Sequence, residues 1–223
     1  RHALDPLVFD GPADGRDPEA WCQRPAREIL SLRLCDFAMG SGAFLVQACR
    51  YLSEKLVQAW DAAEEAHPGK LVVSPEGELS NGGRAERPIP RERGERIAVA
   101  QRFVADRCLY GVDVNPMAVE MAKLSLWLVT LQKDRPFTFL DHALCCGDSL
   151  LGLTDVTQIE HFHLRPEPGR GIPANVFTQE VAPAFEKAIA LRRRIEAMPV
   201  IEVRDLEEKE RLRKGAQEAL EGV

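Results

Sequence analysis

The chain alternates short apolar segments with longer segments of helical periodicity, and this alternation constrains its fold more than any other feature. Residues 29–37, 108–114 and 137–148 are predicted strands, because each is a short, largely apolar segment that contains an acid at or near its end. Segments with apolar residues at helical spacing stand between them. A strand–helix–strand–helix–strand order is typical of a parallel sheet covered by helices, so we expect an α/β fold.

Two of the predicted helices directly follow strands. The first runs from about residue 42 to residue 60, and the second begins at Asn115 and Pro116, a favoured N-cap followed by a favoured first helical residue. A further helix, 96–107, leads into the second strand. The apolar residues of the second helix cover two neighbouring faces, so we expect it to be broadly buried; one of these faces consists of Met117, Met121, Leu124, Leu128 and Leu131.

Two segments lack this regular alternation. Residues 61–96 hold most of the local proline and glycine and are predicted to form an exposed insertion. Residues 154–223 begin as a proline-rich loop and continue as two helical patterns separated by Pro199, so we expect a loop followed by a helical pair.

The composition excludes several classes of protein. A net charge of −6 argues against a broad basic surface, so a nucleic-acid substrate would be held mostly by regions outside this chain. The longest apolar runs fall short of the roughly 18 residues that a membrane span needs. The N-terminus lacks an initiator Met and an apolar signal region, which indicates a segment of a longer chain. The six scattered cysteines predict reduced thiols, no metal site and a cytoplasmic location.

A glycine-rich turn joins the first predicted strand to its helix, in the sequence DFAMGSGAFLV from Asp36 to Val46. Such a turn lets a ligand approach the backbone closely, or it permits tight packing. A dinucleotide fingerprint would require a third glycine, and Leu45 stands in its place. The turn therefore gives poor support for a nicotinamide cofactor.

Asp36, Asp113 and Asp148 each lie at or just past the end of a predicted strand. Parallel sheets bind ligands outside this edge, and an acid at the end of the second strand can bind both hydroxyls of a ribose. Each acid alone is more simply explained as a helix cap or a solvated turn. Three acids in the same place favour a binding site.

Three sequence blocks together resemble motifs I, II and III of the DNA methyltransferases that modify the exocyclic amine of adenine. They are DFAMGSGAFLV, LYGVDVNPMAVEMAKLSLWL and FLDHALCCGDSLLG. The resemblance is to the large enzymes of restriction-modification and phage-defence systems, and it spans roughly residues 31–153. Phe37 departs from the family, in which proline usually follows the first acid.

The resemblance implies a Rossmann-like core that binds S-adenosyl-L-methionine, with residues 1–153 as a partial methyltransferase domain and residues 154–223 as a helical insertion. Asp36 would face the methionine part, Asp113 would bind the ribose hydroxyls, and Asp148 would accept from the adenine amine. The full set of implied cofactor-binding residues is Asp36, Ala38, Gly40, Ser41, Gly42, Phe44, Asp113, Val114, Asp148 and Leu150.

The family's catalytic motif, Asn/Asp-Pro-Pro followed by Tyr or Phe, does not occur in the sequence. No catalytic residue is therefore assigned, and we expect the isolated chain to be inactive. DNA is the implied substrate, and the rest of a larger polypeptide or other restriction and defence subunits are the implied partners. Two alternatives stay open: a fragment that binds cofactor or a partner without catalysis, and a methyltransferase that acts on RNA or protein.

Overall fold

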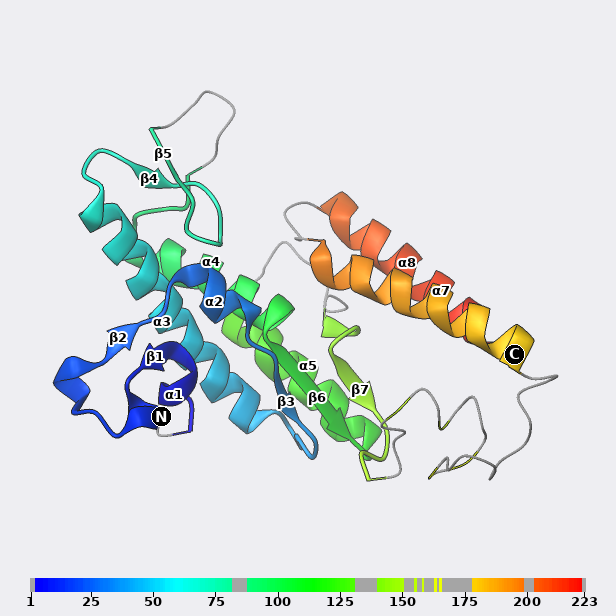
Figure 1. The fold of residues 1–223 in the computed structure, drawn as a ribbon. Helices are drawn as coiled ribbons and strands as arrows, with labels where there is room; N and C mark the ends of the chain where they lie inside the picture. Colours follow the sequence, from blue (N-terminus) through cyan, green and yellow to red (C-terminus); the bar gives the residue numbers. More distant parts are fainter. Residues whose placement is uncertain are drawn as a thin grey trace. The chain divides into compact units, whose positions relative to one another are not determined.

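The computed structural model describes residues 3–81, 88–130, 140–150, 178–198 and 203–221, together with the single residues 155, 158, 163 and 165. The chain divides into two compact units, Arg1–Gly147 and Asp148–Val223. Figure 1 shows the strands in the first unit and the two long helices α7 and α8 in the second.

The first unit is built on a three-stranded parallel sheet in the order β3-β6-β7. Its strands are β3 (Leu34–Asp36), β6 (Leu109–Asp113) and β7 (Leu144–Cys146). Asp36 pairs with Gly111, and Asp113 pairs with Cys146. The predicted mixed α/β architecture with a parallel sheet is confirmed, and the carboxyl ends of neighbouring strands lie at one edge.

The predicted first strand, 29–37, was too long. Ala26–Ser31 forms helix α2, and β3 begins only at Leu34. Ala26, Ile29 and Leu30 are buried, and α2 packs against α3. Their spacing of three and four residues fits one face of a helix, so the apolar residues before Leu34 belong to helical packing.

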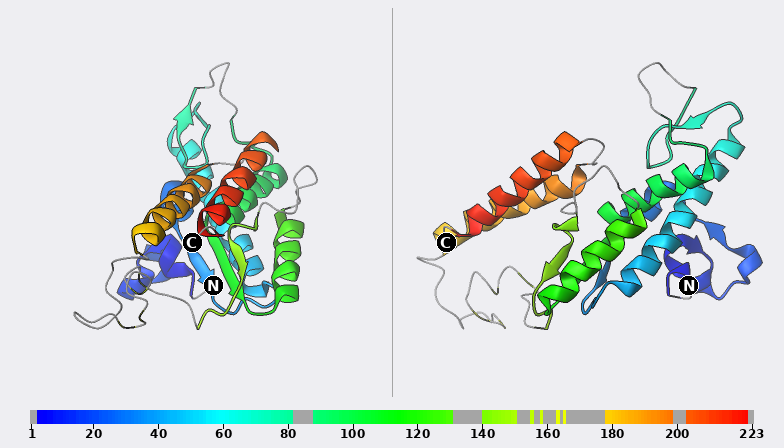
Figure 2. Two further views of the ribbon diagram at one scale, coloured as in Figure 1. Left: turned by 90° about the vertical axis from the view of Figure 1, so that its right-hand side faces the viewer. Right: turned by 180° about the vertical axis from the view of Figure 1, so that it is seen from behind.

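Three helices pack on one another beside the sheet: α3 (Ala43–Ala66), α4 (Arg93–Arg107) and α5 (Pro116–Thr130). Helix α5 lies behind β6 in Figure 1 and in front of it in the reversed view of Figure 2. The core between the helices and the sheet includes fully buried side chains such as Leu45, Leu52 and Leu109. Helix α3 extends six residues beyond its predicted end at Trp60.

Helix α5 is less buried than its sequence indicates. Its buried side includes Val119, Ala122 and Leu126, whereas the face that was also expected to be covered is exposed; it holds Met117, Met121, Leu124 and Leu128. Leu131 lies outside the described residues. The expectation failed because apolar residues occupy a wider arc of this helix than the sheet and its neighbouring helices cover.

The segment predicted to be an exposed insertion is partly buried. It contains the end of α3 and a small antiparallel hairpin of β4 (Leu71–Val72) and β5 (Leu79–Ser80). Val72 is fully buried, and the indole Nε1 of Trp60 donates a hydrogen bond to the Pro75 carbonyl at 2.8 Å. Apolar contact with α3 therefore holds the hairpin, despite its high content of proline and glycine.

A buried arginine links this segment to the helices. The Arg96 side chain is 2% exposed and forms ion pairs with Asp61 at 3.1 Å and with Glu64 at 3.5 Å. Glu64 also accepts from the Val72 N–H at 3.0 Å and from Arg91 at 3.2 Å. Burial tends to raise the pKa of Glu64, but the Val72 N–H and the two arginines outweigh it, so this pKa lies below its usual value.

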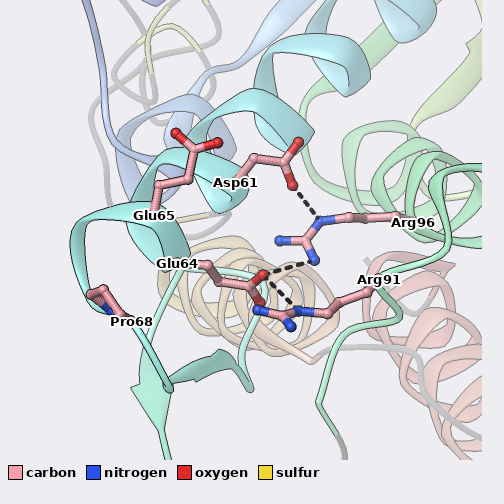
Figure 3. Close-up of a pocket in the computed structure, with 6 residues that line it drawn as sticks. All are labelled: Asp61, Glu64, Glu65, Pro68, Arg91 and Arg96. Carbon is pink, nitrogen blue, oxygen red and sulfur yellow. Dashed lines mark hydrogen bonds and ion pairs between the residues drawn. The ribbon is translucent and has the colours of Figure 1, made fainter.

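Figure 3 shows these charged side chains around an open pocket of about 380 Å³, which Glu65 and Pro68 also line. The pocket lies at the C-terminal end of α3, whereas the glycine-rich turn precedes its N-terminus. The part of α3 between the turn and Asp61, the first lining residue, separates the two by about 27 Å. The pocket is therefore separate from the strand-end residues that the sequence singles out, and ion pairs within its lining compensate part of the charge of buried Arg96.

We expect Glu64→Ala to lower the free energy of unfolding by about 3 kcal/mol, because Arg96 would stay buried with one carboxylate fewer. Urea unfolding followed by circular dichroism measures this change. Glu65→Ala is the matched control, since this neighbouring side chain is exposed and has no ion pair among the described residues; its effect should stay within about 0.5 kcal/mol. Equal losses in the two variants would contradict a structural role for the Arg96 ion pairs.

The N-terminal residues form a small layer against α3. They include helix α1 (Asp5–Val8), two 3₁₀ turns (Pro12–Asp14 and Pro18–Ala20) and an antiparallel pair of β1 (Phe9–Asp10) and β2 (Cys22–Gln23). The Tyr51 hydroxyl donates to Asp5, and the Gln23 amide donates to the Lys55 carbonyl, so residues of α3 hold this layer from both ends.

In the second unit, helices α7 (Thr178–Ala197) and α8 (Val203–Glu221) pack along each other. Ala188, Ile195 and Leu212 are buried in this pair. Charged side chains within α8 form ion pairs three residues apart, as between Arg213 and Glu210 at 2.7 Å. The buried side chains of the pair are therefore mainly apolar, although Lys209 of α8 is also buried.

Five of the six cysteines are either clearly exposed or buried, and Cys145 is intermediate. Cys22, Cys35 and Cys146 are exposed, whereas Cys49 and Cys108 are buried. Burial raises the pKa of both buried thiols to about 12. The described residues contain no cluster of His, Cys, Asp and Glu suited to a metal ion. They also contain no helix with the length and apolar character that a membrane crossing requires.

Candidate cofactor site

The glycine-rich turn adopts a backbone that favours glycine at two positions. Gly40 and Gly42 have φ values of +53° and +79°, in the left-handed region. The Gly42 N–H donates to the Met39 carbonyl at 2.9 Å, which closes the turn, and Gly42 is the N-cap of α3. The turn therefore redirects the chain from β3 into α3 within a few residues.

The two glycines have different surroundings. A Cβ atom added to Gly42 would lie 3.0 Å from the Cβ of Ala122 on α5, whereas one added to Gly40 would meet no atom within 4 Å. Gly42 thus permits close packing of the start of α3 on α5. Gly40 leaves open space beside the backbone, as a ligand-binding turn requires.

We expect Gly40→Ala to lower the free energy of unfolding by about 1 kcal/mol, from the left-handed backbone alone. Gly42→Ala should cost about 1–3 kcal/mol more, because its new methyl group also overlaps Ala122. Chemical unfolding of both variants measures the difference. Adding Ala122→Gly to Gly42→Ala should recover part of the loss, and no recovery would contradict the packing explanation.

Asp113 is the best-connected acid at the strand ends. Its Oδ1 accepts from the Asn115 N–H at 2.9 Å, and its Oδ2 accepts from the Gly40 N–H at 2.8 Å. These two hydrogen bonds, from Asn115 first and then from Gly40, hold the pKa of the Asp113 carboxyl below its usual value. The second bond joins the end of β6 to the glycine-rich turn after β3.

Because the pKa of Asp113 is lower in the folded chain, ionised Asp113 stabilises the fold above the unfolded pKa of about 4. This contribution is lost as the pH falls through the depressed folded-state pKa. The difference in unfolding free energy between the natural chain and Asp113→Asn should therefore shrink from about pH 5 to about pH 2. Urea unfolding across this range measures it, and a constant difference would contradict the assignment.

Asp36 ends the neighbouring strand. Its Oδ1 accepts from the Ala38 N–H at 3.1 Å, and Ala38 is exposed. Ser41 and Phe44 are also exposed, so the outer side of the turn is open to solvent. The structure thus brings Asp36, the glycine-rich turn and Asp113 to one edge of the sheet.

The chain after Asp113 continues this edge. Val114 is 71% exposed, an unusual environment for a valine. Asn115 caps α5 as predicted, because its Oδ1 accepts from the Met117 N–H at 3.0 Å. The Gly147 N–H donates to the Asp113 carbonyl at 3.0 Å, which fixes the end of β7 to the end of β6.

Asp148 and Leu150 belong to the second unit. The Leu150 N–H donates to Asp148 Oδ1 at 2.9 Å, and both residues are exposed. The other eight predicted cofactor-binding residues lie within the first unit, and the cofactor-binding roles of all ten residues stay predictions.

Two residues of this region were missed by the sequence analysis. Met39 is buried beneath the turn, and Gly111 lies in the middle of β6. A Cβ atom added to Gly111 would lie 2.2 Å from the Met39 sulfur. A glycine inside an apolar strand is the signal that could have indicated such a close approach.

Comparison with known protein families supplies the identification. Residues 17–162, well over half of the chain, match the family model described as "MmeI, DNA-methyltransferase domain". The chain belongs to this family. The match supports the sequence-based identification of a DNA methyltransferase of restriction-modification type. Comparisons with curated proteins and with solved structures gave no match.

Proposed function

We propose that this chain supplies the S-adenosyl-L-methionine site of a DNA methyltransferase that acts on N6 of adenine. The observation that carries the proposal is the paired arrangement of Asp113 and Gly40 at the carboxyl edge of the sheet. Bound there, the cofactor supplies an electrophilic methyl group on a sulfonium centre. The residues of this chain bind and orient it.

The free capacity of Asp113 fits a ribose. An ionised carboxylate has about four lone-pair sites, and the Asn115 and Gly40 N–H groups occupy two of them. The remaining sites can accept hydrogen bonds from two neighbouring hydroxyls. Because the pKa of Asp113 lies below its usual value, the carboxylate is ionised at neutral pH and can only accept hydrogen bonds there.

The glycine-rich turn fits the methionine part of the cofactor. The space beside Gly40 lets a ligand approach the backbone, and Asp36 provides a negative charge for the amino group or the sulfonium. Exposed Val114 and Phe44 offer apolar contact to the rings or the chain of the ligand. Asp148, assigned by resemblance, would accept from the adenine amine, and Leu150 would pack on the ring.

DNA as substrate is supported by the family match, whereas adenine specificity rests on the resemblance of the three motifs alone. The Asn/Asp-Pro-Pro-Tyr/Phe motif, which would hold a flipped adenine, is not in the sequence. We therefore propose that the isolated chain binds cofactor without transferring the methyl group. Catalysis would need further residues, supplied by a larger polypeptide or by another subunit.

The same missing motif favours a non-catalytic fragment that binds the cofactor or a partner subunit. The partner-binding form of this fragment is the second candidate function. Cofactor binding separates the two. A partner-binding module would show no affinity for S-adenosyl-L-methionine. The cofactor-binding chain that we propose requires such affinity.

We expect isothermal titration to detect saturable binding of S-adenosyl-L-methionine and S-adenosylhomocysteine to the purified chain. Asp113→Ala should weaken both by about a hundredfold, because two hydrogen bonds to a charged group are lost. Asp17→Ala, which removes an exposed acid outside the site, should leave affinity unchanged. Folded natural chain without measurable affinity would overturn the proposal and favour the binding module.

A further inference from the structure

Met39 and Gly111 fit together between the sheet and the glycine-rich turn. Met39 is 4% exposed, and its N–H donates to the Val112 carbonyl of β6 at 3.1 Å. Its sulfur occupies the space that a side chain on Gly111 would need, 2.2 Å from the point where a Cβ would stand. Gly111 therefore lets the Met39 side chain lie directly on the backbone of β6.

The space around this contact is filled on other sides as well. A Cβ on Gly111 would also lie 3.0 Å from Leu45 Cδ1 and 3.2 Å from Leu144 Cδ2. Leu45 and Leu144 are both buried, and protein interiors leave few voids into which such side chains can shift. A group added to Gly111 must displace the Met39 side chain, and these buried neighbours limit the room into which it can move.

Met39 is joined directly to the candidate site. The next residue, Gly40, donates its N–H to Asp113, which lies two residues after Gly111 in the same strand. The Met39 carbonyl accepts from the Gly42 N–H, so Met39 also closes the turn. The Met39 backbone is therefore bonded both to β6 and to the turn that contains Gly40.

We propose that Met39 and Gly111 are positioning residues for the cofactor site: the Met39 side chain, packed on the bare backbone of Gly111, holds the Gly40 N–H at the Asp113 carboxylate. This inference rests on the proposed function of the site. Neither residue binds the cofactor in this scheme, and both act through the place of Gly40. The turn keeps its position on β6 only if the volume of the side chain at residue 39 matches the space left at residue 111.

The displacement expected from a mismatch is large enough to matter. Hydrogen bonds between N–H and oxygen lie at about 2.7–3.2 Å, so a shift of the turn by even half an ångström weakens the 2.8 Å bond between Gly40 and Asp113. Asp113 would keep its bond from Asn115 and lose the one from Gly40. Its pKa would then rise toward the usual value.

Four forms of the full chain test this: the natural chain, Gly111→Ala, Met39→Ala and the double variant. Without cofactor, NMR should show faster hydrogen exchange at the Gly40 amide and a raised Asp113 pKa in each single variant. Affinity for S-adenosyl-L-methionine should fall by about tenfold, equivalent to one hydrogen bond to a charged group. The double variant relieves the overlap, so all three measurements should return toward those of the natural chain.

Val104→Ala is the control for stability, because Val104 is fully buried in α4 away from the turn. It should lower the melting temperature and leave Gly40 exchange, the Asp113 pKa and cofactor affinity unchanged. If Gly111→Ala fails to fold, Met39→Ala and the double variant still test the inference, since neither adds a group beside an intact Met39.

The outcomes separate this inference from the proposed function. A protected Gly40 amide and an unchanged Asp113 pKa in folded single variants would overturn the positioning role, whatever the affinities are. A natural chain that binds no cofactor would overturn the proposed function, and the NMR measurements would still decide whether Met39 and Gly111 hold the turn. Losses in the double variant equal to the sum of the single losses would also refute the size match.

Discussion

The hydrogen bond from the Gly40 N–H to the Asp113 carboxylate joins two segments that lie more than seventy residues apart in the chain. It depends on the parallel pairing of β3 and β6, which brings their carboxyl ends to one edge. Helices α3 and α5 both begin at this edge, and the partial positive charge of helix N-termini favours a carboxylate there. The contact between Gly42 and Ala122 packs the start of α3 against the middle of α5.

The sequence was informative wherever a feature depends on nearby residues. The ends of β3 and β6, the Asn115 cap of α5 and the turn around Gly40 all follow from short patterns, because turns and caps are set by backbone conformation and local hydrogen bonds. The same patterns singled out Asp113 before its partners were known. Local chemistry was therefore enough to indicate where a ligand could bind.

Features that depend on distant residues could not be read in the same way. The apolar residues before Leu34 fit a strand or a helix equally well in the sequence. Their packing on α3 favours the helix, α2. The exposed apolar face of α5 and the burial of Val72 depend on which elements lie nearby. The fit of Met39 on Gly111 requires the register of β6 beneath the turn, and no spacing along the chain encodes it.

Because Cys49 and Cys108 are buried, the rate at which they react with a thiol reagent can report how often the packed core opens. Thiolate is the reactive form of cysteine, and Cys49 in α3 and Cys108 before β6 are both buried with a pKa of about 12. A thiol reagent would first modify exposed Cys22 and Cys146, and would reach the buried pair only when the core around them opens. The delay between modification of the exposed and of the buried thiols would report how often the core opens, with no cysteine added to the chain.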